Sequence, residues 1–268
     1  MSQSLERGLA VLTRLATDGS QTLEQVAESL GVHKSTAMRL LRSLEANHFV
    51  RREDVSHYRL GSALFDLAHR ALEDLDVRGA AREHLVELGE RTGHTIHLAT
   101  FEEDQAVYVD KVDSRHSVRM YSRVGKRAPM HCTAVGKVLV AEWPARQRRE
   151  LARRLSYPVL TESTITTPEA FLAELDRVRE QGYAVDHGEH EDFIHCIGAP
   201  VHGARGEVVA AISLSVPKVL LDLDGLMALV DDLLGTARRV SAELDWPDTQ
   251  RVSSTEGKID DQDRDQHR

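Results

Sequence analysis

The stretch GVHKSTAMRLLRSLE, residues 31–45, has the spacing of a helix with two unlike sides. Its apolar residues recur three or four positions apart, which places them on one side of a helix: Ala37, Leu40, Leu41 and Leu44. The other side carries imidazole, hydroxyl and basic groups: His33, Lys34, Ser35, Thr36, Arg39 and Arg42. The apolar side requires a packing partner, and the polar side remains available for a ligand.

The flanking sequence supplies that packing partner. Leucines at positions 5, 9, 12 and 15 predict a first helix that ends at Asp18-Gly19-Ser20, and Thr22 is suited to cap a second helix that reaches Leu30. Gly31 then turns the chain, since glycine adopts a positive φ at little cost. The segments HFVRRE and HYRLG, at 48–53 and 57–61, alternate like the strands of a hairpin. Residues 1–61 are therefore predicted to form a winged helix-turn-helix.

The composition limits the class of protein. The chain of 268 residues has ordinary proportions of charged and apolar residues for a globular protein, and no apolar run is long enough to cross a bilayer. The N-terminal segment lacks a signal-peptide core, so we expect a cytoplasmic protein. Two cysteines, Cys132 and Cys196, do not make a disulfide framework.

The charge is distributed unevenly. The whole chain carries a net charge of −9, yet residues 1–60 hold eight Lys or Arg against seven Asp or Glu. The remaining residues are therefore strongly acidic. A polyanionic partner is expected to meet the N-terminal part.

The rest of the chain predicts an α+β domain with a central antiparallel sheet. A linker helix is expected over 62–75, within a connecting segment of residues 62–76. The domain itself is expected over 77–247, followed by a disordered polar tail at 248–268. Within the domain we predict helices at 77–92, 130–143, 145–155, 168–181 and 218–244. Strands are predicted at 94–102, 105–112, 117–124, 182–190, 196–203 and 207–217.

The polar side of the helix at 33–46 predicts contact with DNA. In a helix-turn-helix, the second helix of the pair enters the major groove, and its first turn lies near base edges. His33, Lys34, Ser35 and Thr36 occupy that turn, with Arg39 and Arg42 further along. The hairpin adds Arg51, Arg52, His57 and Arg59, which are placed to reach the flanking phosphates. The alternative is a solvated helix face, which the charge asymmetry and the turn at Gly31 disfavour.

Several motifs resemble the IclR family of bacterial transcription regulators. They are SLERGLAVLTRLA, TLEQVAESLGVHKSTAMRLLRSLEANHFVRRE, YRLG, VGKRAPMHCTAVGKVLVA, TITTPEAF and QGYAVDHGEHEDFIHCIGAPVHGARGEVVAAISLSVP, which together span about residues 4–245. The resemblance implies a winged helix, a linker helix and a GAF-like effector-binding domain. It also implies a homodimer, often paired into a homotetramer, on double-stranded operator DNA. We expect a repressor of a catabolic operon that uses no cofactor.

The same resemblance implies an effector pocket. Ser213 and Ser215 stand two apart in an apolar strand, so both hydroxyls point to one face. The alternative for that face is exposure to solvent. The resemblance places this pair, Asp186, Cys196 and the beginning of a helix around a small carboxylate, and the residues at that helix start are Thr133, Ala134, Val135 and Gly136.

The segment VRMYSRVGKRAP, residues 118–129, resembles the branch of the family that senses 2-keto-3-deoxygluconate. This resemblance implies that Arg119, Met120 and Tyr121 border the pocket, where a cation and a phenol suit a polyhydroxy acid. The alternative is a core strand with one outward arginine. A carboxylate effector would meet the helix start, and Asp186 would suit a hydroxyl of the ligand.

Other chemistries remain as alternatives. His131, His187, His190 and His195, together with the two cysteines, lack the repeated spacing of a zinc site, and we expect no metal. An enzyme that acts on a small carboxylic acid through Cys196 or Asp186, with an attached DNA-binding module, is a second interpretation. A scaffold without a ligand is a third. We expect no catalytic residues.

Overall fold

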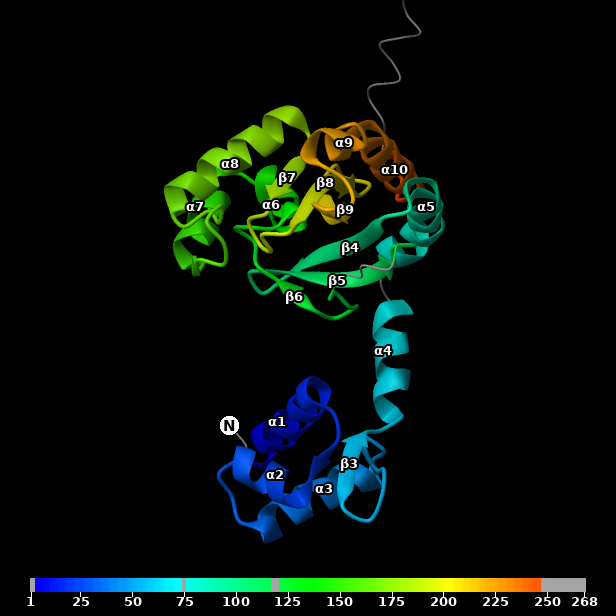
Figure 1. Ribbon diagram of the computed structural model, residues 1–268, viewed down its shortest axis with the longest axis vertical. Coiled ribbons are helices and arrows are strands. Elements are labelled where there is room, and N and C mark those ends of the chain that lie inside the picture. The colour runs from blue at the N-terminus through cyan, green and yellow to red at the C-terminus, as the bar shows by residue number, and fades with distance from the viewer. Residues whose placement is uncertain (1–2, 74–75, 117–120, 247–268) are drawn as a thin grey trace, which may run out of the picture. The chain divides into compact units, whose positions relative to one another are not determined.

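The computed structural model describes residues 3–73, 76–116 and 121–246, and the chain divides into two compact units between residues 74 and 75 (Figure 1). The predicted tail at 248–268 and part of the segment that contains Arg119 and Met120 lie outside the described residues. No helix in the described part is both long and apolar enough to span a bilayer. Each unit is described by itself below.

The N-terminal unit is a winged helix-turn-helix followed by a helix, as predicted. Its strands pair in the order β1-β3-β2, and all pairs are antiparallel. The elements in chain order are α1 (Gln3–Asp18), β1 (Gln21–Thr22), α2 (Leu23–Ser29), α3 (Lys34–Ala46), β2 (Val50–Arg52), β3 (His57–Leu60) and α4 (Ala63–Glu73). The sequence patterns missed only the short strand β1.

Local chemistry explains where these helices begin and turn. Thr22 caps α2 in a capping box: its hydroxyl accepts from the Gln25 N–H, and the Gln25 side chain accepts from the Thr22 N–H. Gly31, with φ of +61°, makes the tight turn into α3. Ala37 and Leu41 of α3 are fully buried in a core with Val11, Leu15 and Val26.

The C-terminal unit is built on a six-stranded sheet with the order β6-β5-β4-β9-β8-β7, in which every neighbouring pair is antiparallel. The predicted α+β fold with a central antiparallel sheet is therefore confirmed. Its elements are α5 (Asp76–Thr92), β4 (Thr95–Glu102), β5 (Gln105–Val112), β6 (Arg127–Ala128), α6 (Ala134–Ala141), α7 (Ala145–Arg154), α8 (Pro168–Gln181), β7 (Ala184–His187), β8 (Ile194–His202), β9 (Val208–Pro217), α9 (Leu223–Met227) and α10 (Val230–Glu243).

Helices cover the curved sheet of this unit. The helix α6 packs on β8 and β9 and is backed by α8, while α10 packs on β8 and on α5 (Figure 1). In β9, Ala211 belongs to the core under α6, and Ser213 and Ser215 lie on the same face by alternation. The intervening Ile212 and Leu214 are fully buried on the other face. The pocket therefore lies on the same face of the sheet as the core under α6, and a second buried apolar layer lies on the other face.

Three predicted boundaries were wrong. The helix expected from 130 begins at Ala134, because Thr133 caps it through a hydrogen bond from the Gly136 N–H. The helix expected over 218–244 is two helices, since Asp222 caps α9 separately and α10 begins at Val230. The strand expected over 117–124 is irregular at its described residues 121–124, and the strand that pairs with β5 is Arg127–Ala128 instead.

Candidate nucleic-acid surface and effector pocket

The polar side of α3 is exposed. His33 is the N-cap of the helix and makes no side-chain capping bond, so its ring is not used by the helix. Among the predicted DNA contacts on this helix only Thr36 is half-buried, and the exposed members are His33, Lys34, Ser35, Arg39 and Arg42. The first turn therefore presents its polar groups to solvent, as a helix that enters a groove requires.

The basic side chains of the unit differ in their partners. Within the described part of the chain, Arg39, Arg42 and Arg51 form no ion pair. The other predicted cations form exposed ion pairs: Lys34 with Glu24 at 2.6 Å, Arg59 with Glu53 at 2.9 Å and Arg52 with Glu45 at 3.7 Å. Exposed pairs of this kind contribute little stability, so phosphates can replace the carboxylates cheaply.

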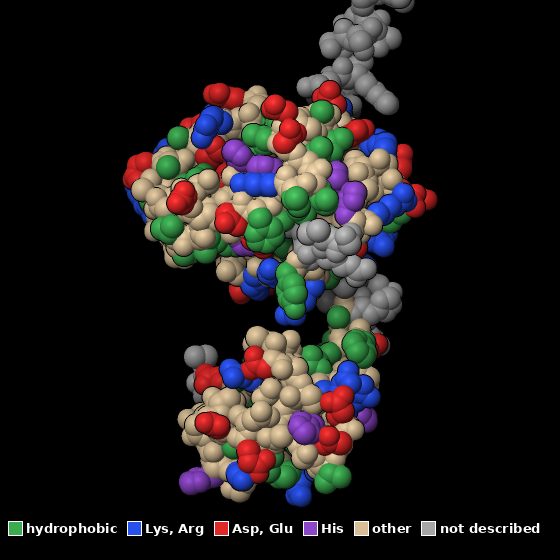
Figure 2. Space-filling model, viewed as in Figure 1, with side chains coloured by type: hydrophobic (Ala, Val, Ile, Leu, Met, Phe, Trp, Pro, Cys, Tyr) green, Lys and Arg blue, Asp and Glu red, His purple; other side chains and the backbone are tan. Residues whose placement is uncertain are grey.

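The hairpin concentrates positive charge on one face. Arg51 of β2 lies directly opposite Arg59 of β3, and like charges in that position repel. Arg52 faces the other side, with its guanidinium 5.2 Å from the centre of the Tyr58 ring. Glu53 already offsets the charge of Arg59 at 2.9 Å, whereas Arg51 has no ion pair within the described part of the chain. Figure 2 shows acidic and basic side chains interspersed on the visible face of this unit, so the positive charge is local.

His57 is engaged within the hairpin turn. Its Nδ1 lies 2.9 Å from Asp54 Oδ2, and the N–H groups of Ser56 and His57 donate to Asp54 Oδ1. These backbone hydrogen bonds hold the pKa of Asp54 well below its usual range. The structure thus uses His57 to shape the turn, whereas the sequence suggested a contact with phosphate.

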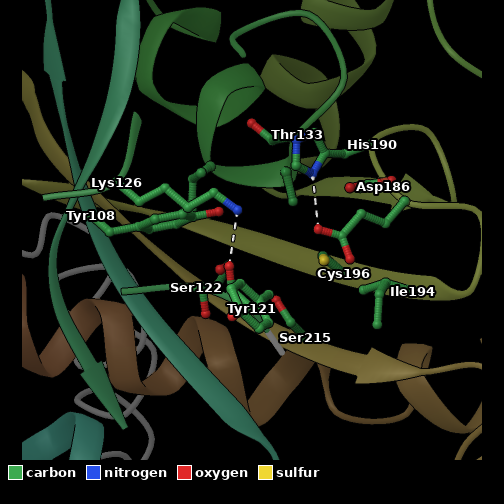
Figure 3. A pocket seen from close by; sticks show the side chains of 14 residues that line it. Tyr108, Tyr121, Ser122, Lys126, Thr133, Asp186, His190, Ile194, Cys196 and Ser215 are labelled. Atoms are coloured by element: carbon green, nitrogen blue, oxygen red, sulfur yellow. Dashed lines mark hydrogen bonds and ion pairs between the residues drawn. The ribbon is translucent and has the colours of Figure 1, made fainter. Parts of the chain in front are cut away.

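In the C-terminal unit, a pocket lies where the start of α6 meets β7, β8 and β9 (Figure 3). Seven predicted effector residues line it: Thr133, Ala134, Val135, Asp186, Cys196, Ser213 and Ser215. Tyr121 also lines it and is 93% exposed. The cavity volume is about 30 Å³, which holds about two waters. A larger ligand must therefore displace lining side chains.

Gly136, also predicted as an effector residue, has a packing role. A Cβ at this position would lie 2.6 Å from the Met130 Cα, so only glycine lets α6 approach the preceding segment. Its N–H donates to the Thr133 hydroxyl at 3.1 Å and is not free for a ligand. Gly136 does not line the pocket, unlike the three residues before it.

Both pocket serines face a buried histidine that the sequence patterns missed. The Ser213 and Ser215 hydroxyls lie 3.4 and 3.5 Å from His97 Nδ1, and His97 Nε2 lies 2.7 Å from the Ser122 hydroxyl. Burial lowers the pKa of His97 to about 3, so the ring is neutral at pH 7. Ser213 and Ser215 are each 3% exposed, which excludes the solvent-facing alternative.

Asp186 is a carboxyl group that can carry a proton near neutral pH. It is buried on β7, and burial raises its pKa to about 7 although it accepts a hydrogen bond from the Glu189 N–H at 2.7 Å. In its protonated form it can donate to a ligand oxygen. Burial likewise raises the pKa of Cys132 to about 12 and that of Cys196 well above the usual thiol range. Both groups are thiols at pH 7, which disfavours a cysteine nucleophile.

A buried ion-pair cluster supports the turn after Asp186. Lys137 of α6 is fully buried, and its Nζ lies 2.5 Å from Glu189, 3.0 Å from Glu174 and 2.8 Å from the Val185 carbonyl oxygen. From the other side, Thr161 donates to the Gly188 carbonyl at 2.6 Å, and Thr164 donates to the Glu189 carbonyl at 2.7 Å. This turn joins Asp186 to the pocket residues His190 and Glu191.

The structure adds pocket residues that the sequence analysis did not select: Tyr108, Ser122, Lys126, His190, Glu191 and Ile194. Tyr108 belongs to β5, Ser122 and Lys126 to the β5–β6 connection, His190 and Glu191 to the β7–β8 connection, and Ile194 begins β8. No motif unites them, and only strand pairing brings them together. Over the described residues, no group of three His, Cys, Asp or Glu is placed to hold a metal ion.

Comparison with known proteins identifies both units. The C-terminal domain model of the bacterial transcriptional regulator IclR matches residues 69–242, and the IclR helix-turn-helix domain matches residues 4–54. The regulator KdgR of Escherichia coli strain K12 is 36% identical over 246 residues, which cover 91% of this chain and 94% of KdgR. These relatives are transcriptional regulators, so the chain is a regulator and the enzyme interpretation is wrong.

Solved structures agree with this result. The IclR protein of Thermotoga maritima has a TM-score of 0.79 at 30% identity, with 91% of this chain and 99% of that chain covered. An IclR homologue of Microbacterium hydrocarbonoxydans in complex with 4-hydroxybenzoate has a TM-score of 0.79 at 26% identity, with coverage of 90% and 99%.

Replacing the buried lysine tests the supporting cluster. Lys137→Met leaves Glu174 and Glu189 buried without their cation, so the free energy of unfolding should fall by about 3–5 kcal/mol. Both tryptophans, Trp143 and Trp246, belong to the C-terminal unit, so their fluorescence during urea denaturation reports that unit. Adding Glu189→Gln should restore part of the loss. A loss below about 1 kcal/mol would contradict the role of the cluster.

The pKa of Asp186 predicts a pH dependence. Between its usual value of 3.8 and about 7, the folded protein keeps a proton that the unfolded chain releases. The free energy of unfolding should therefore fall by about 2–4 kcal/mol as pH rises through this window. Asp186→Asn should remove this component, as measured by urea denaturation from pH 4 to 8. Parallel profiles for the two proteins would show that Asp186 titrates normally.

Proposed function

Because the chain belongs to the IclR family of bacterial transcriptional regulators, we propose that it represses a catabolic operon and is released by a small sugar-acid effector. Residues 1–61 bind the operator, 62–76 connect the two parts, and 77–247 bind the effector and the second protomer. A dimer bound over a promoter excludes polymerase from the same DNA, which is the simplest route to repression.

Three arginines without an ion pair in the described part of the chain are the main support for DNA binding. Arg39 and Arg42 on α3 and Arg51 in the hairpin are exposed and have no carboxylate partner among the described residues. The whole chain carries a net negative charge, so a group of exposed arginines without acidic partners differs from its overall composition. Arg39 reads a base or a phosphate one turn into α3, and Arg51 binds the flanking backbone.

A carboxylate effector fits the chemistry of the pocket. The N–H groups of Ala134 and Val135 belong to the first turn of α6, where backbone donors have no partner within the helix. Ser213, Ser215 and a protonated Asp186 add hydrogen-bond donors for hydroxyl groups. The Microbacterium relative is in complex with 4-hydroxybenzoate, which is also a small carboxylate. We propose 2-keto-3-deoxygluconate as the first candidate.

Exposed apolar residues support a dimer. On α1, Leu5 and Leu9 are 63% and 55% exposed, and on α4, Phe65 and Leu67 are 75% and 50% exposed. A second copy of these helices would bury them. The dimer would place its two α3 helices in successive major grooves roughly 34 Å apart. Two dimers would form a homotetramer on DNA, and α4 would transmit the effector signal with a coupling of about 1–3 kcal/mol.

Replacement of Arg39 tests the DNA surface. Arg39→Ala should weaken binding about 5- to 150-fold to a DNA fragment that the wild-type protein selects from random sequence, since one base or phosphate contact is lost. The measurement is a gel-shift titration. Arg205→Ala, which removes an equal charge from an exposed site in the C-terminal unit, is the matched control. Equal affinity of Arg39→Ala and wild type would exclude a contact by Arg39.

Replacement of both pocket serines tests the effector site. Ser213→Ala with Ser215→Ala should leave affinity for DNA unchanged but weaken binding of 2-keto-3-deoxygluconate at least 10-fold, because two buried donors are lost. Calorimetric titration measures this binding. Ser163→Ala, at an exposed serine outside the pocket, is the control. Undiminished binding in the double variant would place the effector elsewhere.

A further inference from the structure

Lys126 is the one lysine or arginine among the described residues that line the pocket. Its Nζ donates to the Tyr121 carbonyl oxygen at 2.9 Å, the contact drawn in Figure 3. It forms no ion pair within the described part of the chain. The pocket thus contains a full positive charge, and its hydrogen-bond partner among the described residues is a neutral carbonyl group.

The backbone holds this lysine in place. Gly125, with φ of +82°, turns the chain just before it, and the Gly125 N–H donates to the Tyr108 carbonyl at 2.7 Å. The Tyr108 N–H donates in return to the Lys126 carbonyl at 3.1 Å. These two bonds fasten the segment to β5, which also supplies the Tyr108 phenol beside the Lys126 side chain (Figure 3). Lys126 is therefore half-buried and anchored at its backbone.

The charge of Lys126 acts on the interior of the pocket. It contributes to the lowered pKa of His97 under the serines and of His190 on the opposite wall, although burial is the larger cause in both cases. Figure 3 shows Lys126 and Tyr108 on one side of the pocket and Asp186, His190 and Cys196 on the other. A ligand that spans the pocket meets a cation at one end and a carboxyl group at the other.

Nothing else in the described pocket supplies a full positive charge. The start of α6 offers only a partial charge, and one of its donors, the Gly136 N–H, is already bound to Thr133. His190 is held near neutrality by burial, which lowers its pKa. A half-buried ammonium group without an anion loses hydration and gains little in return. A ligand carboxylate would complete the arrangement.

We propose that Lys126 selects anionic effectors by pairing with the ligand carboxylate, which replaces the Tyr121 carbonyl as its partner. The inference rests on the proposed effector function of the pocket and orients the ligand within it. The carboxylate lies at Lys126 and not at the start of α6, where the family resemblance implied it. The hydroxyl groups face Asp186, the paired serines and the first turn of α6. A neutral sugar of the same size would leave the lysine unpaired and would bind weakly.

Calorimetric titration of the full-length protein tests this assignment with two probes, 2-keto-3-deoxygluconate and its uncharged methyl ester. Lys126→Met should weaken binding of the acid about 10- to 100-fold, the loss expected for a charge-assisted hydrogen bond. It should leave binding of the ester unchanged. Lys126→Arg should retain most of the affinity for the acid. Arg123→Met, which removes an exposed cation of the same segment that does not line the pocket, should resemble wild type.

The outcomes separate the two proposals. If wild type binds the acid and Lys126→Met binds it equally well, the role of Lys126 is overturned while the effector pocket stands. If wild type binds neither the acid nor other small carboxylic acids in a thermal-shift panel, the effector proposal itself fails, and this inference fails with it. Should Lys126→Met not fold, Lys126→Gln decides in its place, because it keeps a long polar side chain and removes only the charge; it must bind the acid about 10- to 100-fold more weakly than wild type does.

Discussion

The close approach of α6 to the sheet is the constraint on which the C-terminal unit depends. A Cβ on Gly198 of β8 would lie 3.0 Å from the Ala134 carbonyl carbon, and one on Gly136 would meet the Met130 backbone. Two glycines therefore let the first turn of a fully buried helix rest against β8 and β9. The pocket lies beside this contact. Because the first turn of α6 is held close to β8 and β9, its backbone N–H groups lie near Asp186 and near the hydroxyl groups of Ser213 and Ser215.

The buried charges follow from the same contact. Because α6 is enclosed on every side, Lys137 cannot reach solvent and instead pairs with Glu174 and Glu189. Such a cluster contributes little net stability, since desolvation offsets the attraction between the charges. Its effect is to hold the turn that joins Asp186 to His190. The wall of the pocket and the packing of α6 therefore share one set of interactions, so under the proposed function a ligand that shifts this wall also strains the packing of α6.

In the N-terminal unit, the direction of α3 depends on a small apolar core alone. This core of α1, α2, α3 and Tyr58 is enough to fix the direction of α3, and the polar side of that helix then faces outward without further support. The hairpin places Arg51 opposite Arg59, and Glu53 offsets only the charge of Arg59. An interface that binds a polyanion explains why Arg39, Arg42 and Arg51 are exposed without a carboxylate partner among the described residues.

The sequence by itself determined the local elements: the amphipathic spacing of 33–46, the cap at Thr22, the turn at Gly31 and the alternation through Ser213 and Ser215. It also indicated eight residues that line the pocket, Tyr121 included, through resemblance to a family. Only the tertiary structure decided that His97 lies behind both serines and that Lys126 faces Asp186 across the pocket. These residues lie far apart along the chain, and strand pairing brings them together. A periodic pattern records which face a residue occupies, but it carries no information about which strand lies beside it.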